Sequence, residues 1–112
     1  YGCAQILVST ARQIDAGQEN RFRGKSDAEV AGILQNDNAY NIQLGAAYFA
    51  SNLNKYDGNV RYALARYNGG DKALLPSRDC PGKRAYECKI NQGGYVETEN
   101  YVNNILAVAA RL

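Results

Sequence analysis

The residues able to do chemistry in this chain are restricted by what is missing. None of its 112 residues is histidine, and only three are cysteine. A Ser-His-Asp triad, a Cys-His pair, and a zinc site built from histidines or four cysteines are therefore excluded for this chain alone. Any chemistry must use carboxylates, hydroxyls, amides or backbone groups, so we expect no metal and no cofactor.

Carboxylates are the first candidates, because a carboxylic acid in an apolar setting has a raised pKa and can donate a proton at neutral pH. Most of the 11 acidic residues fall in stretches that we interpret as polar loops or helix caps: Asp15, Glu19, Asp27, Glu29, Asp57, Asp71 and Asp79. Glu97 is the only candidate for a site. Its expected place at a helix N-terminus should keep it ionised, so we do not expect it to be the proton donor.

The elements that position these residues are predicted to be helical. Apolar residues recur at helical spacing and indicate helices near 4–14, 27–36, 41–56, 59–68 and 97–111. Ser26 and Glu29 form a capping-box pattern, and Asn59 is an N-cap candidate. The helix over 41–56 is expected to bury a stripe of Ile42, Ala46, Phe49 and Leu53, and the last helix to carry Tyr101, Ile105, Val108 and Leu112 along one face.

Between the last two helices, residues 69 to about 96 form a long irregular stretch, which in a small domain usually means a functional loop. Within it, Cys80 and Cys88 flank a Pro81-Gly82 turn. We predict a disulfide between them, with Cys3 left unpaired. No linker or repeat interrupts the chain, so we predict a single all-α, or nearly all-α, domain over residues 1–112.

Charge and hydropathy exclude several partners. The net charge is +2, with 13 basic and 11 acidic residues interspersed. This is not the concentrated basic stripe of a nucleic-acid binder. No apolar run approaches the length of a membrane span, so we expect neither nucleic acid nor a membrane span.

Three ordered segments together resemble the soluble lytic transglycosylase family of lysozyme-like domains. Residues 1–6, Tyr-Gly-Cys-Ala-Gln-Ile, resemble the family's Gly-Leu-Met-Gln-Ile, although Cys-Ala replaces Leu-Met. Residues 63–70, Ala-Leu-Ala-Arg-Tyr-Asn-Gly-Gly, are similar to its Ala-Leu-Ala-Ala-Tyr-Asn-Ala-Gly. Residues 95–102, Tyr-Val-Glu-Thr-Glu-Asn-Tyr-Val, resemble its Glu-Thr-x-x-Tyr-Val helix start.

The resemblance implies a lysozyme-like transglycosylase fold and cleavage of peptidoglycan between N-acetylmuramic acid and N-acetylglucosamine. One glutamic acid protonates the glycosidic oxygen and then, as a carboxylate, takes the proton of the muramyl C6 hydroxyl. The product is a 1,6-anhydro sugar. By the same resemblance Tyr67 is a catalytic residue that orients the acid or the sugar, Gln5 and Asn68 bind saccharide, and Glu97 and Tyr101 line the groove.

The family's catalytic Glu-Ser lies on a helix just before the Gly-Leu-Met-Gln segment. We therefore expect the glutamate N-terminal to Tyr1, and residues 1–112 to be a transglycosylase domain lacking that catalytic helix, within a larger protein. The expected partners are peptidoglycan glycan strands and the upstream segment of the same polypeptide. The expected location is the bacterial cell envelope (periplasm) or a phage virion.

Each residue also has a simpler interpretation. Tyr67 is in phase with Val60 and Leu64, so it could be a core tyrosine, and Asn68 could merely end a helix. Glu97 suits the positive end of a helix dipole, and Gln5 could lie on a polar helix face. The alternative function is a catalytically inactive peptidoglycan-binding or structural module in a phage virion or secretion assembly.

Overall fold

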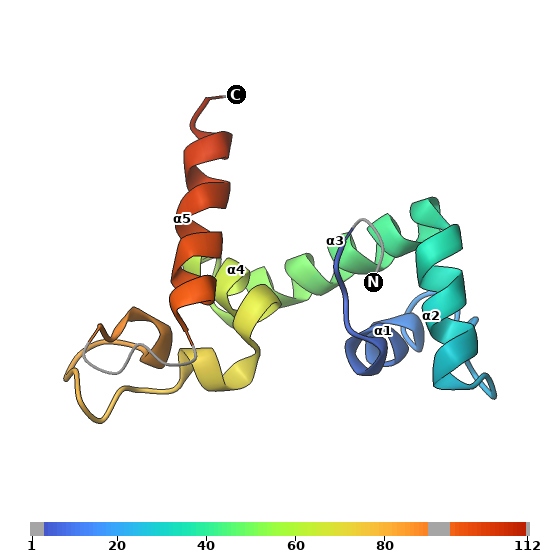
Figure 1. Ribbon diagram of the computed structural model, residues 1–112, viewed down its shortest axis with the longest axis horizontal. Helices are drawn as coiled ribbons and strands as arrows, with labels where there is room; N and C mark the ends of the chain where they lie inside the picture. The colour runs from blue at the N-terminus through green and yellow to red at the C-terminus, as the bar shows by residue number, and fades with distance from the viewer. Residues whose placement is uncertain (1–3, 90–94, 112) are drawn as a thin grey trace. The chain divides into compact units, whose positions relative to one another are not determined.

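The computed structural model describes residues 4–89 and 95–111. Its chain divides into two compact units, Tyr1–Ala50 and Ser51–Leu112 (Figure 1). The regular secondary structure among the described residues is helical. These residues contain one isolated bridge, between Pro76 and Arg84, and no strand. The all-α fold class is therefore confirmed, while the single domain over residues 1–112 stays a prediction.

The first unit contains α1 (Val8–Asp15), α2 (Asp27–Asn36) and the larger part of α3 (Asn38–Lys55). Helices α1 and α2 lie side by side (Figure 1). Burial of apolar side chains from all three helices and the intervening loop drives their packing. The buried cluster comprises Ile6, Ala11, Phe22, Val30, Leu34, Tyr40 and Leu44.

The start of α2 agrees with its sequence signal, and the start of α1 does not. The Ser26 hydroxyl accepts a hydrogen bond from the Glu29 N–H at 3.1 Å, and the Glu29 carboxylate accepts one from the Ser26 N–H at 3.0 Å. This capping box confirms the predicted boundary. Helix α1 begins at Val8 rather than at residue 4, because Gln5 has a φ of 53° in the left-handed region, which no α-helix continues through.

The predicted buried stripe of α3 is wrong in its first half. Ile42 is 55% exposed, whereas Asn41 and Leu44 are fully buried. Asn41 is a polar residue with a structural role: its side-chain amide donates to the Leu34 carbonyl at 2.9 Å, and its Oδ1 accepts from the Ala4 N–H at 2.8 Å. These bonds place the asparagine inward, which hydrophobic periodicity does not predict.

The loop between α1 and α2 corrects the interpretation of Asp15 as a polar-loop residue. Asp15 is 1% exposed. Its carboxylate accepts hydrogen bonds from the Tyr40 hydroxyl and from the backbone N–H groups of Arg21 and Phe22, the latter two at 2.8 and 2.9 Å. Burial acts to raise the pKa of Asp15, but these hydrogen bonds outweigh it and leave the pKa lowered. Burial and the bond to Asp15 raise the pKa of Tyr40 to about 12.

The second unit contains the end of α3, α4 (Val60–Gly69), two short 3-10 turns η1 (Asp71–Leu74) and η2 (Ala85–Glu87), and α5 (Val96–Ala109). Asn59 caps α4 as predicted, accepting from the Tyr62 N–H at 3.1 Å. The buried apolar residues of this unit are Ala63, Leu64, Ala65, Ala73, Leu74, Tyr86, Cys88 and Val102.

The irregular stretch between α4 and α5 contains η1 and η2 and is closed by a Cys80–Cys88 disulfide, which confirms that predicted bond. Cys3, predicted to be unpaired, lies outside the described residues. The ring of Tyr62 packs edge-on against Tyr86 with centroids 6.4 Å apart, so the loop is anchored on α4 by an aromatic contact.

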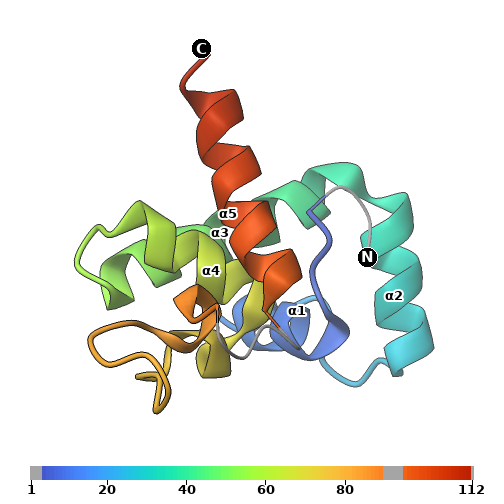
Figure 2. The same ribbon diagram turned by 60° about the vertical axis from the view of Figure 1, so that its left-hand side comes forward.

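Helix α5 runs along α4 with its first turns and extends beyond it with its C-terminal half (Figure 2). Thr98 and Val102 are its buried residues. Ile105 and Val108, predicted to share a face with Tyr101, are 41% and 55% exposed. Leu112 lies outside the described residues. The buried face is therefore rotated toward Thr98 and Val102, because a small polar residue fits the close contact with α4.

The Asp15→Asn substitution tests the buried carboxylate. We expect the free energy of unfolding at pH 7 to fall by about 1–3 kcal/mol, because an amide cannot accept from all three donors and leaves a buried group unsatisfied. A lowered pKa in the folded state means that the ionised form stabilises the fold above the unfolded pKa of about 3.9, and that this stabilisation is lost as the pH falls through the folded pKa.

Urea unfolding of wild type and Asp15→Asn between pH 2 and pH 7 measures both effects. The variant should lose less stability than wild type on acidification. The matched control is Asp79→Asn, an exposed aspartate of the second unit, which should change neither value. Equal acid sensitivity of Asp15→Asn and wild type would contradict the assignment.

Candidate functional site

Tyr67 and Asn68 occupy the last turn of α4, with Tyr67 half-buried and Asn68 exposed. The helix ends one residue later than expected: Gly69 is still helical, and the break falls at Gly70, whose φ is 77°. The Gly70 N–H closes the helix on the Arg66 carbonyl at 2.9 Å. A left-handed residue at this point requires glycine, so the second glycine turns the chain out of α4.

The first glycine has a different role, because α5 packs directly against it. A Cβ at Gly69 would lie 2.8 Å from Thr98 Oγ1 and 2.9 Å from the Ala73 Cβ, too close for either pair of atoms. Thr98 is buried and β-branched, and Ala73 carries only a methyl group fixed to the backbone, so neither can move aside cheaply. Gly69 thus sets the closest approach of α4 and α5.

This contact brings together two of the segments singled out from the sequence. Glu97 is exposed in the first turn of α5, immediately before Thr98, and Tyr101 follows one turn later, half-buried. Burial raises the pKa of the Tyr101 hydroxyl, so it stays protonated at neutral pH. The α4 segment with Tyr67 and Asn68 therefore adjoins the α5 segment with Glu97 and Tyr101.

Gln5 belongs to the first unit and lies on no helix face, contrary to the simpler interpretation. It is exposed, in a left-handed conformation, between two fixed neighbours. On one side the Ala4 N–H donates to Asn41, and on the other Ile6 is 2% exposed in the core. These anchors hold the backbone at Gln5 and leave its side chain at the surface.

A polar network flanks the Tyr67 turn. Arg66 Nε donates to Asp71 Oδ1 at 2.6 Å, and its Nη1 donates to the side-chain oxygen of Asn52, a fully buried residue at the end of α3. Asn52 in turn donates to the Ala63 carbonyl at 3.4 Å. The hydrogen bond and charge of Arg66 lower the pKa of Asp71, which also pairs with Lys55 at 3.6 Å.

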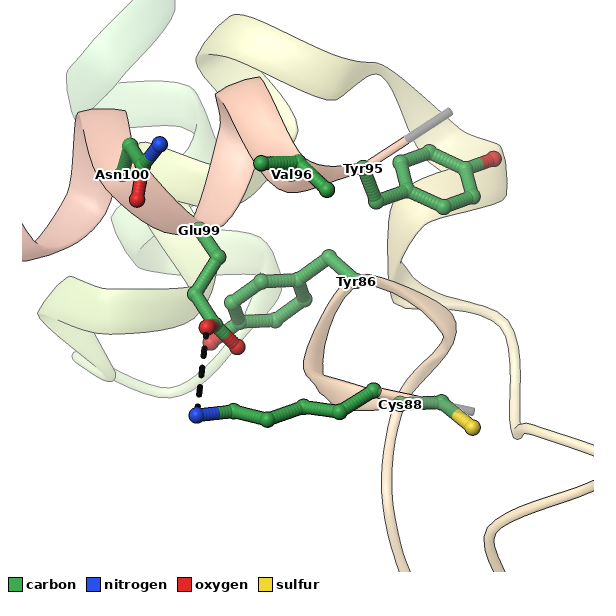
Figure 3. Close-up of a pocket in the computed structure, with 7 residues that line it drawn as sticks. Tyr86, Cys88, Tyr95, Val96, Glu99 and Asn100 are labelled. Carbon is green, nitrogen blue, oxygen red and sulfur yellow. Dashed lines mark ion pairs between the residues drawn. The ribbon is translucent and has the colours of Figure 1, made fainter. Parts of the chain in front are cut away.

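A separate small pocket of about 170 Å³ lies beside the first turn of α5 (Figure 3). In it Glu99 reaches Lys89 in an ion pair of 3.7 Å. None of the five predicted site residues is among its lining residues, which are Tyr86, Cys88, Lys89, Tyr95, Val96, Glu99 and Asn100.

All 11 carboxylic acids lie within the described residues. The carboxyl groups whose pKa departs from its ordinary value, those of Asp15, Glu29, Asp37 and Asp71, all have it lowered. A lowered pKa disfavours the protonated form that a general acid needs at neutral pH. Asp15, the most buried of them, is held ionised by its three donors.

Within the described part of the chain, the Cys, Asp and Glu residues form no group of three or more placed to hold a metal ion. No helix there is both long and apolar enough to cross a membrane.

A family profile described as the transglycosylase SLT domain matches residues 1–87. The chain belongs to this family. The match includes Gln5, Tyr67 and Asn68, whereas Glu97, Tyr101 and the whole of α5 lie after it. No solved structure matches the chain significantly. The roles of the five residues stay predictions.

Sequence reasoning missed the residues that hold the site's backbone. Asn52 is polar, so hydrophobic periodicity places it at the surface of its helix. Gly69 and Thr98 lie far apart in sequence, so the same periodicity does not predict that they are in contact. The signal that could have found them is local: Gly69-Gly70 pairs a close-packing glycine with a turn glycine, and Arg66 precedes Asp71 at a spacing that spans the turn.

Substitution of Gly69 by valine tests the α4–α5 contact. We expect Gly69→Val to lower the free energy of unfolding by about 1–3 kcal/mol through overpacking against Thr98. Gly32→Val is the matched control, because Gly32 is also helical and a Cβ there meets nothing within 4 Å. It should be nearly neutral in denaturant unfolding.

Adding Thr98→Ala to Gly69→Val should restore part of the lost stability, because it removes the clashing Thr98 atoms while the Ala73 Cβ stays in place. Equal effects of the two valine substitutions, or no relief by Thr98→Ala, would contradict the close approach.

Proposed function

We propose that this domain is a peptidoglycan lytic transglycosylase that cleaves the β-1,4 bond between N-acetylmuramic acid and N-acetylglucosamine and leaves a 1,6-anhydro end. The observation that carries the proposal is the adjacency of the Tyr67-Asn68 turn, inside the family match, to the start of α5. The two segments that resemble the family's motifs in sequence thus also meet in the second unit.

In this mechanism the reaction needs one carboxylic acid that acts twice. It protonates the glycosidic oxygen as the bond to the muramyl C1 breaks, and the resulting carboxylate takes the proton of the C6 hydroxyl as the C6 oxygen bonds to C1. No water is consumed. The Tyr67 hydroxyl orients the acid or the sugar, Gln5 and Asn68 bind saccharide, and Glu97 and Tyr101 line the groove.

We further propose that the acid is a glutamate contributed from outside residues 1–112. The support is the environment of the carboxylates within them. The carboxyl groups whose pKa departs from its ordinary value all have it lowered, and Glu97 is exposed in the first turn of α5. A proton-donating glutamate needs an apolar surrounding that raises its pKa.

The proposed location is the bacterial cell envelope or a phage virion, where peptidoglycan is the substrate within reach. The Cys80–Cys88 disulfide supports this, because such bonds persist in oxidising compartments such as the periplasm and on virions.

Digestion of purified sacculi tests the activity. The full-length protein that contains these residues should release 1,6-anhydromuropeptides, identified by mass spectrometry, and residues 1–112 alone should be slower by about a hundred- to ten-thousand-fold, the contribution of a positioned proton donor. Reducing-end products would indicate a hydrolytic lysozyme, and no cleavage by the full-length protein would support the alternative of an inactive module. Full activity of residues 1–112 would place the acid within them.

Tyr67→Phe tests the orienting hydroxyl. In the full-length protein we expect kcat for anhydro-product release to fall by at least about tenfold, since loss of orientation raises the barrier of the chemical step. The melting temperature should change little, because the ring is retained. Tyr56→Phe, a half-buried tyrosine of the same unit, is the matched control and should keep wild-type turnover. Equal turnover of both variants would contradict a catalytic role for Tyr67 and leave it a structural residue.

A further inference from the structure

The Arg66–Asp71 ion pair closes a ring around the turn that carries Tyr67 and Asn68. Arg66 is the residue immediately before Tyr67 on α4, and Asp71 is the first residue of η1. Their 2.6 Å contact therefore spans residues 67–70 from both sides. Within this ring Gly69 already packs against Thr98 and Ala73, whereas a Cβ at Gly70 would meet nothing within 4 Å. Glycine has more backbone freedom than any other residue type, so the chain at Gly70 needs a restraint.

The restraint is anchored in the interior of the second unit. The Arg66 side chain is only 17% exposed, and its second hydrogen bond goes to Asn52, whose own side chain is fully buried and bonded to the α4 backbone at Ala63. Arg66 is thereby fixed on α3 and α4, and it holds Asp71 at a defined place. The chain after Gly70 leaves in a direction set by this contact.

We propose that Arg66 and Asp71 are positioning residues for the transglycosylase reaction, which fix the Tyr67 hydroxyl against the substrate. The inference rests on the proposed function. Arg66 stands where the family pattern quoted above has alanine, so this restraint belongs to this chain rather than to the shared motif.

The exposure of Asp71 separates positioning from stability. Asp71 is 67% exposed, and exposed ion pairs contribute little to folding. Removing its carboxylate should therefore leave the fold intact while freeing the turn. A displacement of about 1 Å in a catalytic group costs on the order of a hundredfold in rate, so the catalytic effect can be large where the stability effect is small.

The test uses the full-length protein with four variants: Asp71→Ala, Tyr67→Phe, the double variant, and Asp79→Ala as an exposed carboxylate of the same unit without a place in the ring. We expect Asp71→Ala to lower kcat about ten- to a hundredfold with KM within about twofold of wild type. Its melting temperature should fall by no more than about 5 °C. Asp79→Ala should match wild type in all three.

The kcat of the double variant decides whether Asp71 acts through Tyr67. If Asp71 acts through Tyr67, the double variant is no slower than the slower single variant, whereas a general structural role makes the two losses multiply. Multiplied losses overturn the inference, as does wild-type kcat in Asp71→Ala.

A second measurement does not depend on activity. Amide hydrogen exchange at residues 68–71 should speed up at least about tenfold in Asp71→Ala and stay unchanged in Asp79→Ala. Unchanged exchange in Asp71→Ala shows that the ion pair does not restrain the turn and overturns the inference even if the protein is active. If wild type releases no anhydro product, the proposed function fails and the positioning role with it. A fast exchange result then shows that the failure lies in the function and not in the restraint.

Discussion

The close approach of α4 and α5 at Gly69 and Thr98 is the constraint on which the site depends. Because the space between them admits no Cβ, the end of α4 and the first turn of α5 are held at one distance. Tyr67 and Asn68 lie just before this contact on one helix, and Glu97 just before it on the other. A close-packed interior transmits any change there as backbone movement, so the geometry of both segments is set by one pair of small residues.

Within each unit, polar groups fix the irregular backbone. In the first unit a buried carboxylate, Asp15, gathers two backbone N–H groups and a tyrosine hydroxyl and so determines the course of the α1–α2 loop. In the second, Arg66 joins buried Asn52 to Asp71 across the turn after α4. Both devices satisfy buried polar groups with charge-assisted hydrogen bonds, which are stronger than neutral ones. Carboxylates here serve as acceptors that hold structure.

This use of its acids agrees with the proposed function, in which a separate glutamate supplies the proton. A buried carboxylate surrounded by donors is stabilised in its charged form, and a general acid requires the opposite surroundings. The roles proposed for Gln5, Tyr67 and Asn68 all concern substrate positioning. Positioning contributes a large share of a catalytic rate enhancement even when the proton comes from elsewhere.

The sequence by itself determined the helical class, the capping of α2 and α4, the disulfide in the loop and the family. Each rests on a local signal: an apolar period, a Ser-x-x-Glu box, an asparagine before a helix, two cysteines around a Pro-Gly turn, and short ordered motifs. The candidate roles of Gln5, Tyr67, Asn68, Glu97 and Tyr101 came from those motifs as well. Local signals gave the wrong result for three features: the start of α1, the exposure of Ile42 and the burial of Asp15.

Only the tertiary structure decided these three features, because they depend on interactions with residues far away in the chain. Asp15 is inward because Tyr40, 25 residues later, donates to it, and Asn41 displaces Ile42 from the interior because the Ala4 N–H and the Leu34 carbonyl need partners. The sequence predicted that α4 ends at residue 68, whereas Gly69 is still helical and packs against Thr98. Burial of a polar residue is settled by long-range hydrogen bonds, which no hydrophobic period encodes.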